Sequence, residues 1–377
     1  MSPHPTFAIG LPPTTANVAK KIPTKQHCLK VKRLLDCKPD EKAIIYHRGA
    51  VSKNREGTDV ELEFRQDSHF FYLTGVDEPG FHVMMDLQTE LVYLVPPALP
   101  EDYETVWKGA PDTSAQLHDK YDADVILDES ELAAHVAHAT TIYTMDTTDL
   151  SNLQISPHRS CRIDRSALVN ALCEARLTKF PWEIAMIKHA GYVSSVAHKM
   201  VMKRHAALRT ELVVAAYFRY VSALHGLERQ AYIPIVASGP RAATLHYNRN
   251  NQPIPTANPH AVVLVDAGAE WRCYASDVTR TFPASQKFSP EARTIYSIVL
   301  KMQEAVLSRL KPGVMWIELE DLALRILCIE LIRIGILRGD EDELLEFEVP
   351  RAFYYHGLGH SVGLDVHDVG GKKEAVP

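Results

Sequence analysis

The 377-residue sequence has few cysteines and no dense cysteine framework. The six cysteines are Cys28, Cys37, Cys161, Cys173, Cys273 and Cys328. No Cys-X-X-Cys pair occurs among them, so the pattern indicates neither a zinc knuckle nor a disulfide-stapled scaffold. Widely spaced thiols of this kind are typical of proteins in a reducing compartment.

Long apolar runs and an excess of positive charge are also missing. The longest apolar stretch, 322–337, contains Arg325, Glu330 and Arg333, so it cannot span a bilayer. Residues 1–21 contain four prolines and no continuous apolar segment, which disfavours a secretory signal peptide. Lys and Arg total 41 against 47 Asp and Glu, and this net charge of −6 disfavours binding to nucleic-acid phosphates. We therefore expect a cytoplasmic protein with no nucleic-acid and no membrane partner.

Two widespread nucleotide-binding motifs are absent as well. The sequence has no P-loop and no Rossmann fingerprint, which removes the commonest NTPase and dinucleotide-binding classes. Hydrophobic residues make up 46% of the chain and charged residues 23%, as in ordinary globular proteins. The length suits two domains of roughly 100–200 residues each. A site for a small molecule or a peptide is the remaining expectation.

The first half of the chain alternates predicted strands with predicted helices. Strand candidates, rich in β-branched and aromatic residues, are 43–46, 70–73, 82–85, 91–95 and 142–145. Helical spacing marks 25–35, 114–119 and 130–137. The pattern predicts an α/β domain, a mixed sheet with covering helices, over residues 24–177. A flexible arm, rich in proline and threonine, is expected at residues 1–23.

The pattern shifts to longer helices near residues 165–182, and we place the domain boundary near residue 178. Predicted helices are 166–176, 182–203, 210–224, 292–310 and 316–334. Predicted strands are 231–238, 261–266 and 274–282. The acidic run 340–343 reads as a solvated loop. We therefore place a second domain at residues 178–377.

The strongest local signal is a pair of aspartates at strand positions. Asp266 ends an apolar strand, and Asp277 follows eleven residues later in a second predicted strand. In a simple hairpin this odd separation places the two carboxylates opposite each other, about 4.5–5.5 Å apart at Cβ, where like charges destabilise the pair unless a cation neutralises them. Metal binding is one interpretation. The other is that these aspartates end strands and bind turn amides, as strand-end aspartates usually do.

A second signal is a segment rich in glycine and histidine. Three histidines, His356, His360 and His367, lie within twelve residues and are separated by glycines. A zincin motif is excluded because no Glu follows His356 and the glycines disfavour the helix that the motif requires. A fourth histidine, His246, follows a Gly-Pro turn that would present it at the edge of a cleft. A solvent-exposed side chain is the alternative for His246.

Together these segments resemble the aminopeptidase P and prolidase branch of the creatinase–methionine aminopeptidase family, whose fold is called pita-bread. The stretch from Phe64 to Gly80 resembles that branch's N-terminal domain, and the stretch from Arg176 to Lys188 resembles the opening of its catalytic domain. The segments around Asp266, Asp277 and 356–368 resemble its metal and catalytic motifs. The resemblance covers nearly the whole chain. It implies a creatinase-like N-terminal domain followed by a pita-bread metallopeptidase domain.

The resemblance also implies roles for individual residues. Asp266 would bind one metal ion, Asp277 would bridge two, and His360 would be the imidazole ligand. His246, His356 and His367 would line the substrate pocket, with His367 hydrogen-bonded to the scissile carbonyl. The implied cofactor is manganese, two ions per subunit, which suits a site made mostly of carboxylates. The implied reaction releases an N-terminal residue from a peptide with proline in second position.

The sequence departs from the family's pattern at two further ligands. The family site includes a Glu in a Val-Glu-Pro-Gly strand and another Glu near the C-terminus, and neither has a counterpart here. Glu78, in Val76-Asp-Glu-Pro-Gly80, belongs to the N-terminal signature, and Glu374 has no matching context. We therefore expect a catalytic domain that is truncated at its C-terminal end, with three of five ligands. A truncated gene model and a real shortened product both remain open.

Three functions follow from these observations. The first is an Xaa-Pro aminopeptidase, and the second is a prolidase restricted to Xaa-Pro dipeptides. The third is a catalytically silent pita-bread module that binds peptides or proteins, which the two missing glutamates favour. Family members commonly pair through the N-terminal domain, so the resemblance also implies a homodimer.

Overall fold

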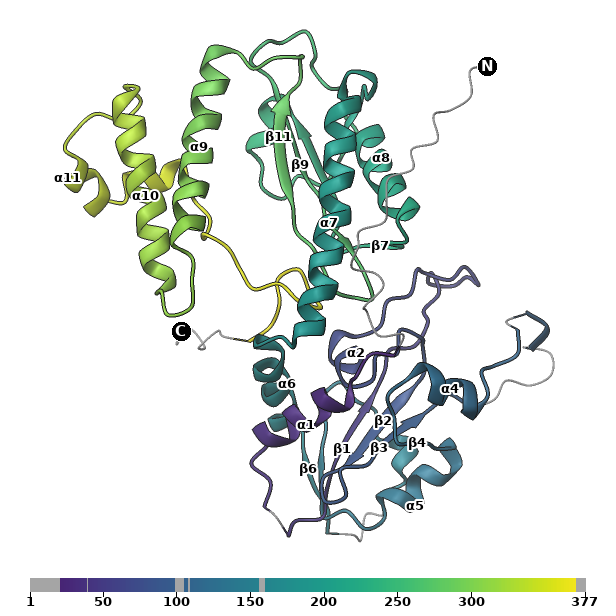
Figure 1. Ribbon diagram of the computed structural model, residues 1–377. Coiled ribbons are helices and arrows are strands. Elements are labelled where there is room, and N and C mark those ends of the chain that lie inside the picture. The colour runs from purple at the N-terminus through teal and green to yellow at the C-terminus, as the bar shows by residue number, and fades with distance from the viewer. Residues whose placement is uncertain (1–20, 39, 99–104, 108, 156–159, 371–377) are drawn as a thin grey trace. The chain divides into compact units, whose positions relative to one another are not determined.

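The computed structural model describes residues 21–38, 40–98, 105–107, 109–155 and 160–370 (Figure 1). Most of the predicted flexible arm, residues 1–23, lies outside these residues, and so does Glu374. Internal contacts divide the chain into two compact units. The first unit combines described residues up to 192 with 270–276 and 362–370, and the second combines 193–269 with 277–361. The predicted domain boundary near residue 178 stays a prediction.

The first unit contains a six-stranded mixed sheet. Its strands are β1 (Ala43–Arg48), β2 (His82–Asp86), β3 (Val92–Val95), β4 (Val125–Ile126), β5 (Thr141–Tyr143) and β6 (Arg162–Asp164). The spatial order is β4-β3-β2-β1-β5-β6. β2 pairs antiparallel with β1 and β3, whereas the β1–β5, β5–β6 and β3–β4 pairs are parallel. The predicted mixed sheet is confirmed.

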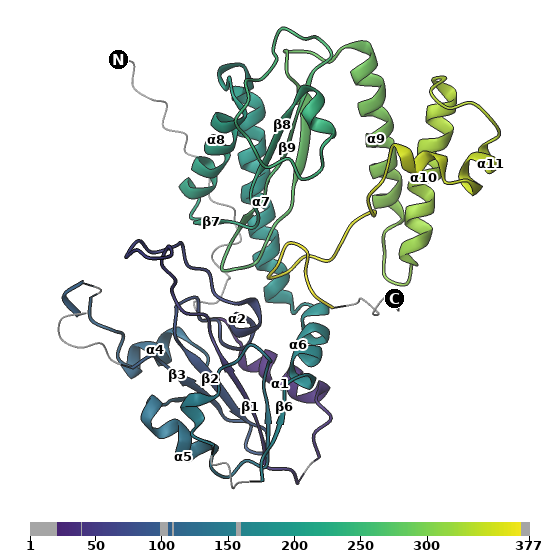
Figure 2. The same ribbon diagram turned by 180° about the vertical axis from the view of Figure 1, so that it is seen from behind.

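Helices cover both faces of this sheet (Figures 1 and 2). The helices are α1 (Lys25–Leu34), α2 (Ser68–Thr74), α4 (Ser114–Lys120), α5 (Leu132–Val136) and α6 (Ala167–Leu177), with short 3-10 turns η2 (Glu129–Glu131) and η3 (Ser151–Leu153). Side chains of a strand point alternately to its two faces. Ile45 therefore packs in the core cluster that includes residues of α1 and α6, whereas Ile44 packs in the cluster that includes residues of α5.

The predicted strand at 70–73 is wrong, because these residues belong to helix α2. The Asp67 side chain caps the helix by accepting a hydrogen bond from the Phe70 amide at 2.9 Å. Gly75, with φ 69°, ends the helix in the left-handed conformation that glycine adopts easily. Nearly every side chain of α2 is buried, so the sequence shows no polar face, and its aromatic residues imitate a strand.

The second unit contains a three-stranded antiparallel sheet and two groups of helices. Its strands, in spatial order, are β11 (Thr279–Pro283), β9 (Val262–Asp266) and β8 (Ile235–Ser238). Its helices are α8 (Glu211–Leu224), α9 (Pro290–Arg309), α10 (Trp316–Arg333) and α11 (Glu341–Glu346), with 3-10 turns η4 (His205–Ala207), η5 (Gly239–Ala243) and η6 (Val349–Ala352). Helix α7 (Pro181–Arg204) runs through the point in the chain where the units divide. The remaining strands, β7 (Arg229–Gln230) and β10 (Ala269–Glu270), have two residues each.

Two apolar clusters are the larger ones described in the second unit. Val263 and Val265 of β9 pack with Phe218 of α8 in one cluster, which also receives residues of α7. The other cluster lies between α9 and α10, where Met302 and Leu331 are buried. Burial of side chains this large contributes about 1.5–3 kcal/mol each. No helix in the described part of the chain is long and apolar enough to cross a membrane.

Two further predictions for the second unit need correction. The acidic run 340–343 does not form a loop, because Asp340 caps α11 and accepts hydrogen bonds from the Asp342 and Glu343 amides. Carboxylates in the first turn of a helix interact favourably with its dipole, which the solvated-loop interpretation overlooked. The strand predicted from 274 begins only at Thr279.

Candidate metal centre

Asp266 lies at the end of β9 in the second unit. β9 is the central strand, so the Asp266 backbone pairs with Ile235 of β8 on one side and Thr279 of β11 on the other. The prediction that Asp277 lies directly opposite Asp266 is wrong, because Thr279 occupies that position. The intervening segment is not a simple hairpin loop: it contains β10 and two left-handed residues, Arg272 and Cys273. A shift of two residues nevertheless keeps a side chain on the same face of a sheet.

Tyr232 connects the two aspartates. Its hydroxyl donates to the Asp266 carboxylate and also lies 3.1 Å from Oδ1 of Asp277. A phenol has one proton, so the two carboxylates share a single donor. Burial raises the pKa of Tyr232, and the two neighbouring carboxylates raise it further, which keeps the hydroxyl protonated. Sequence analysis missed Tyr232 because no motif marks it.

The charge balance at Asp266 is unfavourable without a cation. Burial raises the pKa of the Asp266 carboxyl, and the Asp277 carboxylate raises it further. The Tyr232 hydrogen bond, Thr279 and the nearby His246 act in the opposite direction without cancelling the rise. Such repulsion between adjacent carboxylates is what a bound divalent cation relieves.

His360 lies beside Asp277 with a fixed ring orientation. Its Nδ1 is 3.0 Å from the Ser361 carbonyl oxygen, which can only accept, so Nδ1 carries a proton. Its Nε2 is 3.1 Å from Oδ2 of Asp277. A carboxylate also only accepts, so a cation bound by both Nε2 and Oδ2 of Asp277 would suit this pair. A metal-binding histidine typically donates its other ring N–H to a carbonyl in this way.

The donor set fits a hard divalent cation better than it fits a soft one, because it consists of carboxylate oxygens and one imidazole. The three predicted ligands are linked in the order Asp266, Tyr232, Asp277, His360. Among the described residues, however, no group of three His, Cys, Asp or Glu side chains converges closely enough to hold an ion as it stands. The chemistry therefore fits a metal, and a closed coordination shell would need movement of these side chains.

His246 lies in a loop that a buried carboxylate holds in place. Glu211, at the start of α8, is completely buried and accepts hydrogen bonds from across this loop. Its donors are the Ser238 amide and hydroxyl, Arg241 Nε, the Tyr247 hydroxyl and the Gln252 amide, at 2.7–3.1 Å. Because Tyr247 follows His246, Glu211 fixes the backbone that presents this histidine. Glu211 is a second residue that sequence analysis missed.

The remaining predicted residues are distributed over both units. His356, in the second unit, is exposed, and its ring contacts Tyr354 edge-on with centroids 4.6 Å apart. His367 belongs to the first unit, between Asp365 and Asp368, which both bind Arg176. The pocket roles of His246, His356 and His367 stay predictions.

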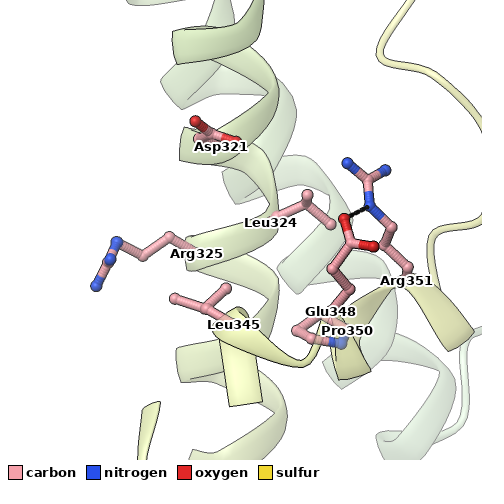
Figure 3. A pocket seen from close by; sticks show the side chains of 7 residues that line it. All are labelled: Asp321, Leu324, Arg325, Leu345, Glu348, Pro350 and Arg351. Atoms are coloured by element: carbon pink, nitrogen blue, oxygen red, sulfur yellow. Dashed lines mark hydrogen bonds and ion pairs between the residues drawn. The ribbon is translucent and has the colours of Figure 1, made fainter. Parts of the chain in front are cut away.

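A cavity of about 200 Å³ lies elsewhere in the second unit, among α10, α11 and η6 (Figure 3). Its lining residues are Asp321, Leu324, Arg325, Leu345, Glu348, Pro350 and Arg351. Arg351 pairs with Glu348 at 2.8 Å, and Arg325 pairs with Glu341. Because both arginines are paired, the cavity offers no unpaired cation to a ligand, and it contains none of the predicted site residues.

Comparison with known proteins places this chemistry in a family. Residues 185–376 match the profile of metallopeptidase family M24, and residues 27–144 match the aminopeptidase P N-terminal domain. A probable Xaa-Pro aminopeptidase PEPP of Coccidioides posadasii is 39% identical over 369 residues, 95% of this chain and 78% of that protein. The chain belongs to metallopeptidase family M24. A probable Xaa-Pro aminopeptidase of Verticillium alfalfae is also 39% identical, over 93% of this chain and 76% of that protein.

Solved structures of two aminopeptidases are similar to this chain. The low-pH form of Escherichia coli aminopeptidase P has a TM-score of 0.81 and 28% identity, and the match covers 93% of this chain and 82% of that one. Aminopeptidase PepP of Pseudomonas aeruginosa has a TM-score of 0.80 and 28% identity, over 95% of this chain and 84% of that one. The predicted resemblance is confirmed: this M24 member has an aminopeptidase P N-terminal domain with a mixed sheet, followed by a metallopeptidase domain.

Proposed function

We propose that this M24 member is an Xaa-Pro aminopeptidase that removes an N-terminal residue preceding proline. The observation that carries the proposal is the linked set Asp266, Tyr232, Asp277 and His360, with the His360 ring oriented by the Ser361 carbonyl. The family match and the names of the relatives support it. Proline lacks an amide N–H and has a fixed φ, so an Xaa-Pro bond requires a specialised peptidase.

We propose that Asp266, Asp277 and His360 would hold the metal, for which we propose manganese. Bound metal would lower the pKa of water and polarise the scissile carbonyl. The chain's own residues supply the rest of the site. The Tyr232 hydroxyl lies between the two carboxylates and keeps them close together. The Ser361 carbonyl oxygen orients the His360 ring.

We assign His246, His356 and His367 to the substrate pocket, where imidazoles would stabilise the negative charge that develops on the scissile carbonyl oxygen. His367 is the proposed hydrogen-bond donor to that oxygen. The proposed substrate is a peptide with proline in second position. We further propose a cytoplasmic homodimer, which light scattering and cell fractionation would test.

The test is release of the first residue from a tripeptide Xaa-Pro-Yaa in the presence of manganese, measured by mass spectrometry. A matched peptide with alanine in second position and the dipeptide Xaa-Pro serve as controls. We expect release of the first residue from Xaa-Pro-Yaa but not from the alanine peptide or the dipeptide, and we expect Asp277→Asn to abolish this release. Cleavage of the dipeptide alone would establish a prolidase instead. Peptide binding without any cleavage would establish the silent module, and equal cleavage of the alanine peptide would refute proline specificity.

A further inference from the structure

Arg176, in the last turn of α6, holds two carboxylates of a segment that is distant in sequence. Its Nη2 lies 2.6 Å from Oδ2 of Asp365 and 2.6 Å from Oδ1 of Asp368. All three residues belong to the first unit. The Arg176 side chain is 2% exposed and that of Asp368 is 1% exposed, so the Arg176–Asp368 pair is cut off from water. His367 lies in the chain between the two aspartates.

The same segment has further attachments in the first unit. Lys179 Nζ binds the other Asp368 oxygen at 2.7 Å, and Ser68 Oγ donates to Asp365 at 2.8 Å. Arg65 Nη2 donates to the Leu364 carbonyl oxygen at 2.6 Å. The segment is therefore bound two and three residues before His367 and one residue after it.

Steric fit adds to these ion pairs. A Cβ atom on Gly363 would overlap the Asp368 carboxylate, so only glycine lets this carboxylate lie against the backbone of residue 363. Removing one partner of a buried ion pair strongly destabilises the folded protein, because the other charge stays buried without compensation. The buried Arg176–Asp368 pair, together with the Arg176–Asp365 contact, therefore favours the observed arrangement of residues 365–368.

We propose that Arg176 is a positioning residue that fixes His367 through Asp365 and Asp368. The anchors lie two residues before and one residue after His367, and consecutive Cα atoms are about 3.8 Å apart, so the His367 backbone has little freedom. A displacement of about 1 Å in a catalytic group can reduce turnover about 100-fold. The consequence for catalysis rests on the proposed function, in which His367 faces the scissile carbonyl. The effect on the environment of the His367 side chain does not depend on the proposed function.

The first test is independent of hydrolysis. Protein labelled with carbon-13 at histidine Cε1 is compared by NMR as wild type, Arg176→Gln and Arg176→Lys, and His367→Gln assigns the His367 signal. We expect Arg176→Gln to shift or broaden the His367 signal while signals from the second unit stay unchanged, with partial recovery in Arg176→Lys. The control is Arg325→Gln, which removes an exposed arginine that also pairs with two carboxylates. An unchanged His367 signal in folded Arg176→Gln would overturn the proposal.

Asp365→Asn provides a milder variant if Arg176→Gln does not fold. It retains the Arg176–Asp368 pair, and we expect a smaller displacement of the same signal, whereas no displacement would again contradict the proposal. Turnover of Xaa-Pro-Yaa is the second readout, with kcat reduced about tenfold or more and KM changed less than about threefold. Absence of turnover in the wild type would refute the proposed function and leave the NMR result to decide the role of Arg176.

Discussion

At the scale of single residues, Tyr232 is the clearest addition to what the motifs predict. Asp266, Asp277 and His360 could be selected from sequence because each lies in a recognisable segment. Tyr232 could not, because its importance depends on the loop before β8 bringing one hydroxyl to two carboxylates, one at the end of β9 and one in the segment before β11. The role of Glu211 likewise depends on contacts with residues distant in sequence, which no motif marks.

Tyr232→Phe tests this addition. The substitution removes the hydroxyl that holds the two carboxylates close together, so metal binding must also bring them into position, and we expect manganese affinity to fall about tenfold, equivalent to about 1.4 kcal/mol. Calorimetric titration measures it. Tyr220→Phe, at an exposed position of α8, is the control and should bind as the wild type does.

A second prediction concerns the pH dependence of stability. Because the pKa of Asp266 is raised in the folded protein, the unfolded chain loses this proton first, and stability falls as pH rises from the ordinary value of 3.8 through the folded pKa. Asp266→Asn abolishes that loss. We expect the metal-free variant to be about 1 kcal/mol more stable than the wild type at pH 7 in urea unfolding with EDTA. Equal stability of the wild type and Asp266→Asn at pH 7 would contradict the raised pKa of Asp266 in the folded protein.

At the scale of elements, sequence periodicity predicted the amphipathic helices and the buried strands well. It failed where a helix is buried all round, as in α2, and where charge stabilises a short helix through its cap, as in α11. It also failed on the register between β9 and β11, because the intervening segment folds into β10 and left-handed residues before the second strand begins. The periodicity of hydrophobic residues within each strand carries no information about how the segment between the strands folds.

The cap of α2 is open to a direct test. Asp67→Ala removes the acceptor for the Phe70 amide, and loss of a helix cap costs about 1 kcal/mol. Asp67→Asn keeps an acceptor at the same position and should retain most of the stability. Urea unfolding of the two variants compares them, and equal destabilisation would mean that the charge beside His47, and not the cap, is what matters.

At the scale of the whole molecule, the five-ligand site that the resemblance implies includes two glutamates with no counterpart in residues 1–377. We therefore predict that a polypeptide of these 377 residues binds manganese weakly and turns over Xaa-Pro peptides slowly. Elemental analysis after gel filtration should find well below two manganese ions per chain. Two retained ions with rapid manganese-dependent turnover would contradict this prediction.

The first unit is assembled from separated parts of the chain, and this has a consequence for biosynthesis. Asp368 meets Arg176 across 192 residues of sequence. A ribosome adds about 5–20 residues per second, so Asp368 is synthesised about 10–40 s after Arg176. During that interval the nascent chain carries an uncompensated cation in a half-built interior, and a chaperone that shields it would raise the yield of native protein.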